Sequence, residues 1–153
     1  MNSELSVVIY ILVLLSSHEN EKLTSTQISE RIRVNPARIR RVLSSIKKVG
    51  YVKAKEGIEG GYVLSKDPYE ITLKDVYTLV SSKPLQIPKP SMMTKGNLTT
   101  EVDIQLASIF IESEQQLMQQ LEKITLGSML HVMKECALET VESFDDEEEI
   151  IGG

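Results

Sequence analysis

The stretch that decides the fold is TSTQISERIRVNPARIRRVLSSIKKVG, residues 24–50. Thr24 and Gln27 have the spacing of a capping box, which predicts the start of a first helix. Asn35 is a good N-cap residue and Pro36 suits the first helical position, so a second helix is expected to begin there. The glycine that closes the stretch ends this helix. Two short helices joined by a tight turn predict a helix-turn-helix.

The second helix of this motif separates apolar from basic side chains. Its apolar residues recur at helical spacing up to Val49, and four of them are expected to face the core: Ile39, Val42, Leu43 and Ile46. The remaining stripes are small or basic: Ala37, Arg38, Arg40, Arg41, Ser44, Ser45, Lys47 and Lys48. In a DNA-binding helix-turn-helix the second helix lies in the major groove of the DNA, where an arginine can donate two hydrogen bonds to the edge of a guanine. We therefore expect the arginines to read bases and the lysines to contact phosphates.

A β-hairpin is predicted after the second helix, because the hydrophobic period changes to two. Residues 51–55 and 62–65 are the expected strands, and the loop 56–61 between them contains three glycines, as a projecting wing requires. The predicted DNA-binding set is completed by two residues at the helix start and five in the hairpin: Asn35, Pro36, Lys53, Lys55, Gly60, Gly61 and Tyr62. With an apolar helix over 5–15 and another from Thr72, the fold class is mainly α with a small β-hairpin, a winged helix-turn-helix.

The second half of the chain predicts an interchain helix. Residues 1–80 are the expected DNA-binding domain, 81–98 a proline-containing linker, 99–143 a long helix with a C-terminal helix, and 144–153 an acidic tail. The long helix carries two apolar stripes, more than a monomer of this size can bury. We expect one stripe to form a dimer interface: Leu106, Ile109, Phe110, Leu117 and Leu121.

The net charge of -5 hides an asymmetry along the chain. Residues 1–98 contain 15 Lys and Arg against 9 Asp and Glu, whereas residues 99–153 contain 2 against 13. Between residues 31 and 55 there are nine cations and no acidic residue up to Lys55. The alternative is a solvated helix face, but such a face normally includes acids, since cations three or four residues apart repel each other. This block therefore predicts a polyanionic partner.

The sequence contains few residues that would suit catalysis, metal binding or a membrane span. A single cysteine, Cys136, cannot form an internal disulfide or a cysteine-rich metal site, and its apolar neighbours predict an inert, buried thiol. His18 and His131 are the only histidines and lie in different segments. The apolar run 7–15 is shorter than the roughly 18 residues of a membrane span. We expect a cytoplasmic protein without catalytic residues, metal or cofactor, and without membrane contact.

Four short motifs follow one another along the chain. They are KKVGYV at 47–52, GGYVL at 60–64, EITLKDV at 70–76 and ITL at 124–126. In this order they resemble the Rrf2 (Rrf-two) family of bacterial transcription regulators, whose best-known member is the iron–sulfur cluster regulator. The resemblance covers residues 3–130. It implies a homodimeric winged-helix DNA-binding protein whose long helix crosses over the partner subunit.

Two departures limit what the resemblance implies. Cluster-binding members carry three cysteines between the fourth helix and the long helix, and residues 83–98 contain none, so an iron–sulfur cluster is excluded by ligand count. Family wings often carry an arginine before the first wing glycine, where this chain has Glu56, with Lys55 as the available substitute. Asn35, Pro36 and Arg41 resemble the cysteine-free branch of the family.

The sequence thus predicts a homodimeric, sequence-specific DNA-binding transcription regulator, a repressor without an iron–sulfur cluster. Its two recognition helices would enter successive major grooves about 34 Å apart on a palindromic double-stranded operator. The alternative is a winged-helix protein-interaction module with only non-specific DNA affinity. Such a module needs exposed apolar residues on the recognition helix or wing, where only Ile58 and Tyr62 are available. A small-molecule effector stays open, and the sequence identifies none.

Overall fold

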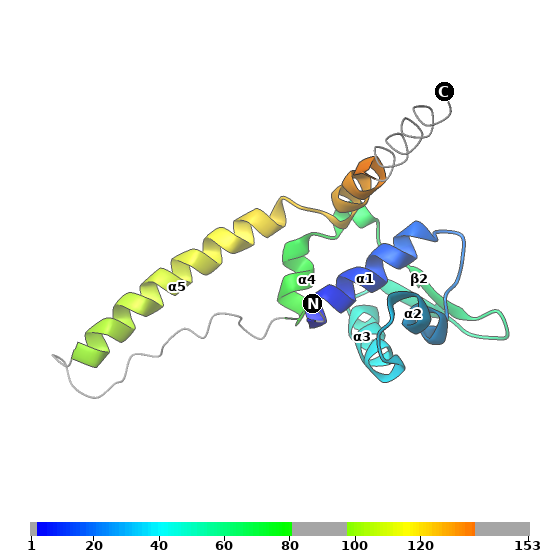
Figure 1. Cartoon of the computed structure of the whole chain (residues 1–153), viewed down its shortest axis with the longest axis horizontal. Helices are drawn as coiled ribbons and strands as arrows, with labels where there is room; N and C mark the ends of the chain where they lie inside the picture. The colour runs from blue at the N-terminus through cyan, green and yellow to red at the C-terminus, as the bar shows by residue number, and fades with distance from the viewer. Residues whose placement is uncertain (1–2, 81–97, 137–153) are drawn as a thin grey trace, which may run out of the picture. The chain divides into compact units, whose positions relative to one another are not determined.

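The computed structural model describes residues 3–80 and 98–136, and these form the predicted mainly α fold with one hairpin (Figure 1). The elements in chain order are α1 (Glu4–Ser17), α2 (Ser25–Ile32), α3 (Pro36–Lys48), β1 (Val52–Lys55), β2 (Gly61–Leu64), the 3-10 helix η1 (Pro68–Glu70), α4 (Leu73–Val80) and α5 (Leu98–Glu122). Residues 126–136 are also helical. The fold class predicted from the sequence is confirmed.

The described residues fall into two compact units. The first contains residues 3–71 and 125–136, and the second contains 72–80 and 98–124. The predicted linker 81–98, except its last residue, and the acidic tail 144–153 lie outside the described residues. The predicted domain limits therefore stay predictions.

The core of the first unit forms where α1, α2 and α3 pack together with the hairpin. Its fully buried side chains include Ile11, Leu12, Leu15, Leu23, Ile28, Ile39, Leu43, Ile46, Ile71 and Leu126. Burial of each such side chain stabilises the fold by about 1.5–3 kcal/mol relative to exposure. The N–H of Leu126 donates to the carbonyl of Ile71 over 2.8 Å, which ties residues 125–136 to this core.

Side-chain caps fix the ends of the helices where the sequence predicted them. At α2 the N–H of Gln27 donates to Oγ1 of Thr24 over 3.2 Å, and the N–H of Thr24 donates to the Gln27 side chain over 2.9 Å. Beyond α3, Gly50 adopts φ +80°, a left-handed conformation that glycine takes without steric cost. These local signals set where α2 begins and where α3 ends.

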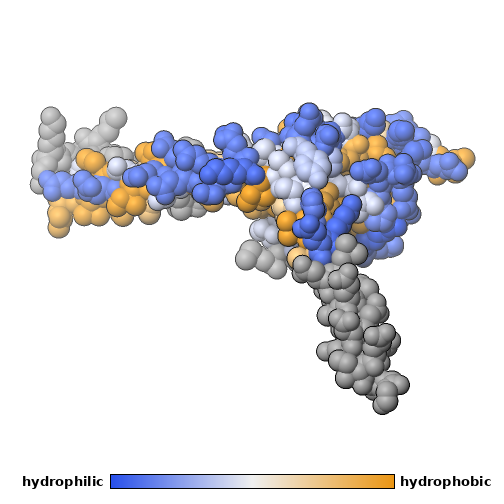
Figure 2. Space-filling model, turned by 90° about the horizontal axis from the view of Figure 1, so that it is seen from above, coloured by the Kyte–Doolittle hydropathy of each residue, from blue (hydrophilic) through white to orange (hydrophobic). Residues whose placement is uncertain are grey.

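The second unit consists of α4 and α5, and α5 is a 25-residue helix with no buried residue. The side chains of Leu106, Ile109 and Leu117 are exposed, and those of Phe110 and Leu121 are half-buried. Apolar residues gather along one edge of this helix and hydrophilic residues along the other (Figure 2). The apolar edge therefore has no cover within the described chain.

Two details differ from the sequence-based expectations. Cys136 is exposed, not buried, because Val132 and Met133 on the same helix are themselves exposed in the described chain. The 3-10 helix η1 was not predicted. Its start is set by Asp67, whose side chain accepts a hydrogen bond of 2.8 Å from the N–H of Tyr69. In the part of the chain that the structure describes, no helix has the length and apolarity needed to cross a membrane.

Candidate nucleic-acid interface

The turn between α2 and α3 is held by two hydrogen bonds to Ser29 of α2. The Ser29 hydroxyl donates to the Val34 carbonyl over 2.6 Å, and the Val34 N–H donates to the Ser29 carbonyl over 3.2 Å. Ser29 and Val34 are both buried. Because both bonds join α2 to the turn, α3 leaves the turn in a fixed direction, as a helix-turn-helix requires.

The start of α3 is capped by Asn35. Its side-chain oxygen accepts a hydrogen bond of 2.8 Å from the N–H of Ala37, and Pro36 occupies the first turn, where a missing N–H costs nothing. The capping bond uses the amide oxygen of Asn35 and leaves the amide NH2 group to donate outward. Asn35, Pro36 and Ala37 are exposed, so the predicted contacts at this end of the helix are accessible.

Opposite faces of α3 are apolar and basic, as the sequence predicted. Ile39, Val42, Leu43 and Ile46 are buried, whereas Val49, which follows the helix, is exposed. The other face carries exposed Arg40, Arg41, Ser44, Lys47 and Lys48, with Arg38 and Ser45 half-buried at its edges. The structure therefore brings the predicted base-reading and phosphate-contacting side chains of α3 onto one accessible face.

Five cations of this surface have no partner for their side chains among the described residues. They are Arg40, Lys47, Lys48, Lys53 and Lys55, the last two on β1. All five are exposed. Like charges held close together without counter-charges favour the binding of an anion, and a run of them along a helix and its adjacent strand matches a phosphate backbone.

Arg41 differs from these five because it is paired across the fold. Its guanidinium lies 3.6 Å from the carboxylate of Glu4, in the first turn of α1. Both side chains are largely exposed, and such pairs contribute about 0–1 kcal/mol. Arg41 can therefore exchange Glu4 for a DNA group at small cost. Because Glu4 and Arg41 are far apart in the sequence, this pair could not be predicted from the sequence.

The hairpin attaches to the helices through its second strand. β1 and β2 pair antiparallel, with Ala54 opposite Tyr62 and Lys55 opposite Gly61. The Tyr62 N–H donates to the Leu23 carbonyl over 2.8 Å, and the Leu23 N–H donates back over 3.2 Å. A Cβ on Gly61 would lie 2.9 Å from the backbone carbon of Leu23. The structure thus gives Gly61 and Tyr62 a packing role, and their predicted DNA contacts stay predictions.

The tip of the wing is acidic and apolar. Ile58 is fully exposed, and Glu56 and Glu59 beside it are exposed too. Gly60 closes the loop, since its N–H donates to the Gly57 carbonyl over 3.0 Å and an added Cβ would lie 2.6 Å from the Lys55 carbonyl oxygen. Carboxylates at the tip repel phosphates, which points to β1 rather than the tip as the wing surface for DNA.

Arg31 of the basic block pairs with two residues that follow α1. Nδ1 of His18 lies 2.8 Å from the Leu14 carbonyl, which can only accept, so Nδ1 carries the proton. Nε2 then accepts from Arg31 over 2.9 Å, and Arg31 also reaches Glu21 over 3.4 Å. Glu21 also lies 3.9 Å from Nε2 of His18, so the three side chains form one cluster.

Arg33 is a residue of this interface that the predicted site omitted. It caps the C-terminus of α2 with φ 55° and ψ 47°, the left-handed conformation, and among the described residues it is the one non-glycine with positive φ. Glycine or asparagine usually occupies such a position. Arg33 is exposed in the turn before α3, and the left-handed conformation costs it about 1 kcal/mol or more relative to glycine. The basic block included Arg33, but nothing in the sequence showed its conformation.

Replacing Arg33 with glycine should raise the free energy of unfolding by about 0.5–1.5 kcal/mol, because glycine adopts the left-handed conformation without strain. Urea titration of the purified protein measures this change as a higher midpoint at unchanged slope. Arg33→Ala is the matched control, since alanine removes the guanidinium but keeps the strain. Equal midpoints for the glycine and alanine variants would contradict the conformational explanation.

The family is settled by comparison with known proteins. The family model described as Rrf2, iron-dependent transcriptional regulator, matches residues 1–132. The chain belongs to the Rrf2 family. This finding confirms the family resemblance seen in the sequence, and it makes the protein a member of a family of DNA-binding transcription regulators.

Relatives within the Rrf2 family are candidate regulators. The candidate HTH-type transcriptional regulator YwnA of Bacillus subtilis (strain 168) is 37% identical over 83 residues, which are 54% of this chain and 60% of YwnA. YwgB of the same organism is 33% identical over 84 residues, 54% of each chain. The chain thus matches little more than half the length of these curated relatives.

Solved structures extend the likeness over most of the chain. A candidate transcriptional regulator from Lactobacillus plantarum superposes with a TM-score of 0.75 at 22% identity, over 95% of this chain and 99% of that one. IscR of T. potens superposes with a TM-score of 0.68 at 20% identity, over 89% of each chain. At these identities the likeness shows a shared fold, and it agrees with the winged helix-turn-helix described above.

The residues of this Rrf2 chain do not fit an iron–sulfur cluster, although the family description names iron. Such clusters are held mainly by several cysteine thiolates, and the whole sequence contains one cysteine, Cys136, which is exposed on helix 126–136. Within residues 3–80 and 98–136, no three His, Cys, Asp or Glu side chains gather as a metal site would require. The chain therefore lacks the cysteine ligands that such a cluster requires.

Proposed function

We propose that this Rrf2-family protein is a homodimeric, sequence-specific DNA-binding transcription repressor that acts without an iron–sulfur cluster. The observation that carries the proposal is the basic face of α3. Arg40, Lys47 and Lys48 are exposed there without a side-chain partner in the described chain, on the second helix of a helix-turn-helix. A palindromic operator follows from two-fold symmetry, with half-sites about 34 Å apart.

The position of each cation along α3 suggests its role. Arg40 and Arg41 lie in the N-terminal half of the helix, the part that reaches base edges in helix-turn-helix complexes. Lys47 and Lys48 lie in the last turn, and Lys53 and Lys55 follow on β1. Ammonium groups at these positions suit phosphates, which set affinity and its salt dependence but not sequence preference.

Selection of random duplex DNA on the purified protein tests the proposal. We expect enrichment of an inverted repeat whose half-sites are centred about one helical turn apart, and affinity that falls steeply with salt. In vitro transcription from a promoter that overlaps the selected site should then decrease when the protein is added. Enrichment of no inverted repeat would overturn the operator proposal, and increased transcription would overturn the repressor assignment.

Arg40→Ala and Lys48→Ala should have different effects on the selected DNA. Loss of Arg40 should reduce discrimination at one base pair by about 1–3 kcal/mol, because a bidentate contact to guanine is lost. Loss of Lys48 should weaken selected and scrambled duplexes alike and reduce the salt slope by about one. Fluorescence anisotropy across a salt series measures both effects. The control is Lys123→Ala, which removes an exposed cation of the second unit. Identical behaviour of the Arg40 and Lys48 variants would refute the division of roles.

One observation favours the alternative function, a protein-interaction module. Ile58 is 108% exposed at the wing tip, where an apolar side chain gains nothing from water. A partner protein captured through the wing in high salt, and lost with Ile58→Ser, would support this function. The alternative gives the basic face of α3 only a non-specific affinity for DNA and no use for arginines at the N-terminal half of the helix, which is why sequence-specific DNA binding is the preferred proposal.

A further inference from the structure

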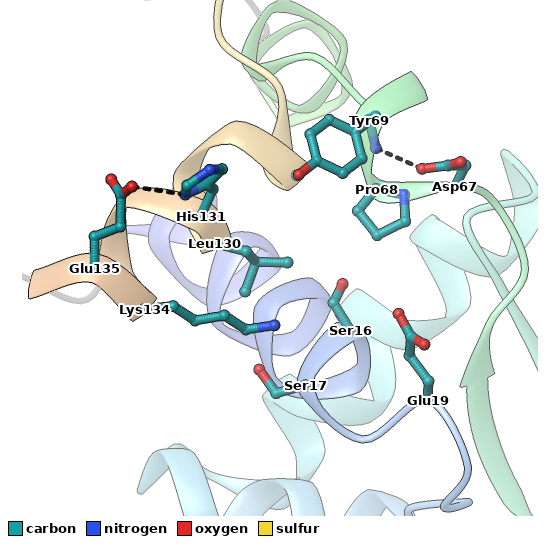
Figure 3. Close-up of a pocket in the computed structure, with 11 residues that line it drawn as sticks. Ser16, Ser17, Glu19, Asp67, Pro68, Tyr69, Leu130, His131, Lys134 and Glu135 are labelled. Atoms are coloured by element: carbon teal, nitrogen blue, oxygen red, sulfur yellow. Dashed lines mark hydrogen bonds and ion pairs between the residues drawn. The ribbon is translucent and has the colours of Figure 1, made fainter. Parts of the chain in front are cut away.

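The first unit contains a hollow of about 740 Å³ beside the C-terminal end of α1 (Figure 3). It lies between the C-terminal end of α1, the short helix η1 and helix 126–136, which all belong to the first unit. Its volume falls within the range of about 300–1,000 Å³ that is typical of small-molecule sites. None of the residues predicted to bind DNA takes part in it.

One wall of the hollow is an aromatic ring held in place by a glycine. The Tyr69 ring lies against Gly127 so closely that a Cβ on Gly127 would be 2.6 Å from two ring atoms. The Tyr69 N–H also donates to the Asp67 carboxylate. The Gly127 backbone therefore lies against the ring, while Tyr69 stays largely exposed and lines the hollow. With Pro68 and Leu130 it forms an apolar surface suited to a ring or alkyl group (Figure 3).

Charges of opposite sign flank this apolar surface. Glu19 projects into the hollow from the residues after α1, and Lys134 extends toward α1 from helix 126–136 (Figure 3). Neither side chain has a hydrogen-bond or ion-pair partner among the described residues. His131, in contrast, lies 3.5 Å from Glu135 on its own helix. Within the described part of the chain, the hollow therefore offers one carboxylate and one ammonium group without a partner, from two separate segments.

The C-terminal end of α1 adds to the negative side. The hydroxyls of Ser16 and Ser17 donate to the carbonyls of Leu12 and Val13 over 2.7 and 2.9 Å, so each hydroxyl oxygen still has acceptor capacity. Carbonyl groups at a helix C-terminus also favour positive charge. An incoming ammonium group thus has acceptors near Glu19, while Lys134 provides the donor for a carboxylate.

We propose that this hollow binds a small zwitterion, an α-amino acid with an aromatic or large apolar side chain. The side chain would pack on Tyr69 and Leu130, the carboxylate would bind Lys134 and the ammonium group would bind Glu19. A purely anionic ligand would meet Glu19, Asp67 and Glu135, and a purely cationic one would leave Lys134 unmatched. The site does not depend on the proposed DNA-binding function.

Isothermal titration calorimetry on the whole chain, without DNA, tests the site directly. Each of the common L-amino acids is titrated, together with phenethylamine and 3-phenylpropionate, which lack one charged end of phenylalanine. We expect an aromatic or large aliphatic amino acid to bind with a Kd of about 1 mM or tighter, and both truncated analogues to bind at least about tenfold more weakly. Absence of binding by every amino acid would overturn the proposal, even if the protein binds DNA.

Four charge-neutralising variants locate the binding. Lys134→Gln and Glu19→Gln should each weaken the titrated amino acid about tenfold or more, since each loses a charge-assisted contact. Lys22→Gln and Glu30→Gln remove the same charges at exposed positions outside the hollow and should leave the Kd unchanged. All four are surface changes of small expected effect on folding. Undiminished binding by Lys134→Gln and Glu19→Gln would overturn the site, as would equal binding of phenethylamine and phenylalanine.

Discussion

Replacing Leu106 and Leu117 of α5 with glutamate is expected to convert the protein into a monomer and to weaken binding to a two-half-site operator by about 100-fold or more. The physical reason is the lack of cover for α5, a 25-residue helix with no buried residue. Both leucines are exposed in the single chain and lie on its predicted dimer stripe. A carboxylate placed within an apolar interface must be desolvated without a partner, which costs several kcal/mol.

Sedimentation velocity at micromolar protein measures the first effect, and anisotropy with operators of one and two half-sites measures the second. The matched control is the variant Gln105→Glu with Gln119→Glu, which adds the same two charges to the polar side of the same helix. This control should remain a dimer and keep the operator affinity. A Leu106→Glu, Leu117→Glu protein that still sediments as a dimer would show that this stripe of α5 is not the interface.

The long helix illustrates what periodicity can and cannot predict. Its existence and both apolar stripes followed from spacing alone, because no glycine or proline interrupts residues 100–124. Its exact start does not follow from spacing, since α5 is described from Leu98 whereas the predicted segment starts at residue 99. Which stripe a partner covers also lies beyond the sequence, because a single chain buries neither of them.

The DNA-binding unit was predicted more fully because its signals are local. The cap at Thr24, the cap at Asn35 and the apolar face of α3 each depend on residues within a few positions, and each is confirmed. The contacts that could not be predicted join distant parts of the chain. Arg41 of α3 meets Glu4 of α1 at the surface, and the Tyr69 ring fills the space that Gly127 leaves.

In the wing, Gly61 has a packing role that its predicted DNA contact did not include. Gly61 was expected to contact DNA, as one of three glycines in the loop of a projecting wing. In the structure its missing side chain makes room for the Leu23 backbone, with a virtual Cβ 2.9–3.1 Å from three Leu23 atoms. That approach allows the two hydrogen bonds between Leu23 and Tyr62, which hold the hairpin to the residues before α2.

Gly61→Ala should therefore lower the free energy of unfolding by about 2–4 kcal/mol, the sum of conformational strain and a steric clash with backbone that cannot retreat. Leu23 is fully buried, so its backbone can move only by disturbing the core or by breaking its bonds to Tyr62. Because a small domain has a total stability of about 5–15 kcal/mol, this one methyl group is a severe perturbation. The wing should detach before the helices unfold.

Gly57→Ala separates the two contributions within the same hairpin. Gly57 also has positive φ, +112°, but a Cβ there would meet nothing within 4 Å. This variant should lose only the conformational part, about 1–2 kcal/mol. Urea titration gives both free energies, and hydrogen exchange at the Tyr62 amide reports whether the wing has detached, with faster exchange in Gly61→Ala alone. Equal losses in the two variants, with the Tyr62 amide still protected, would mean that the close approach of Gly61 to Leu23 does not hold the wing in place.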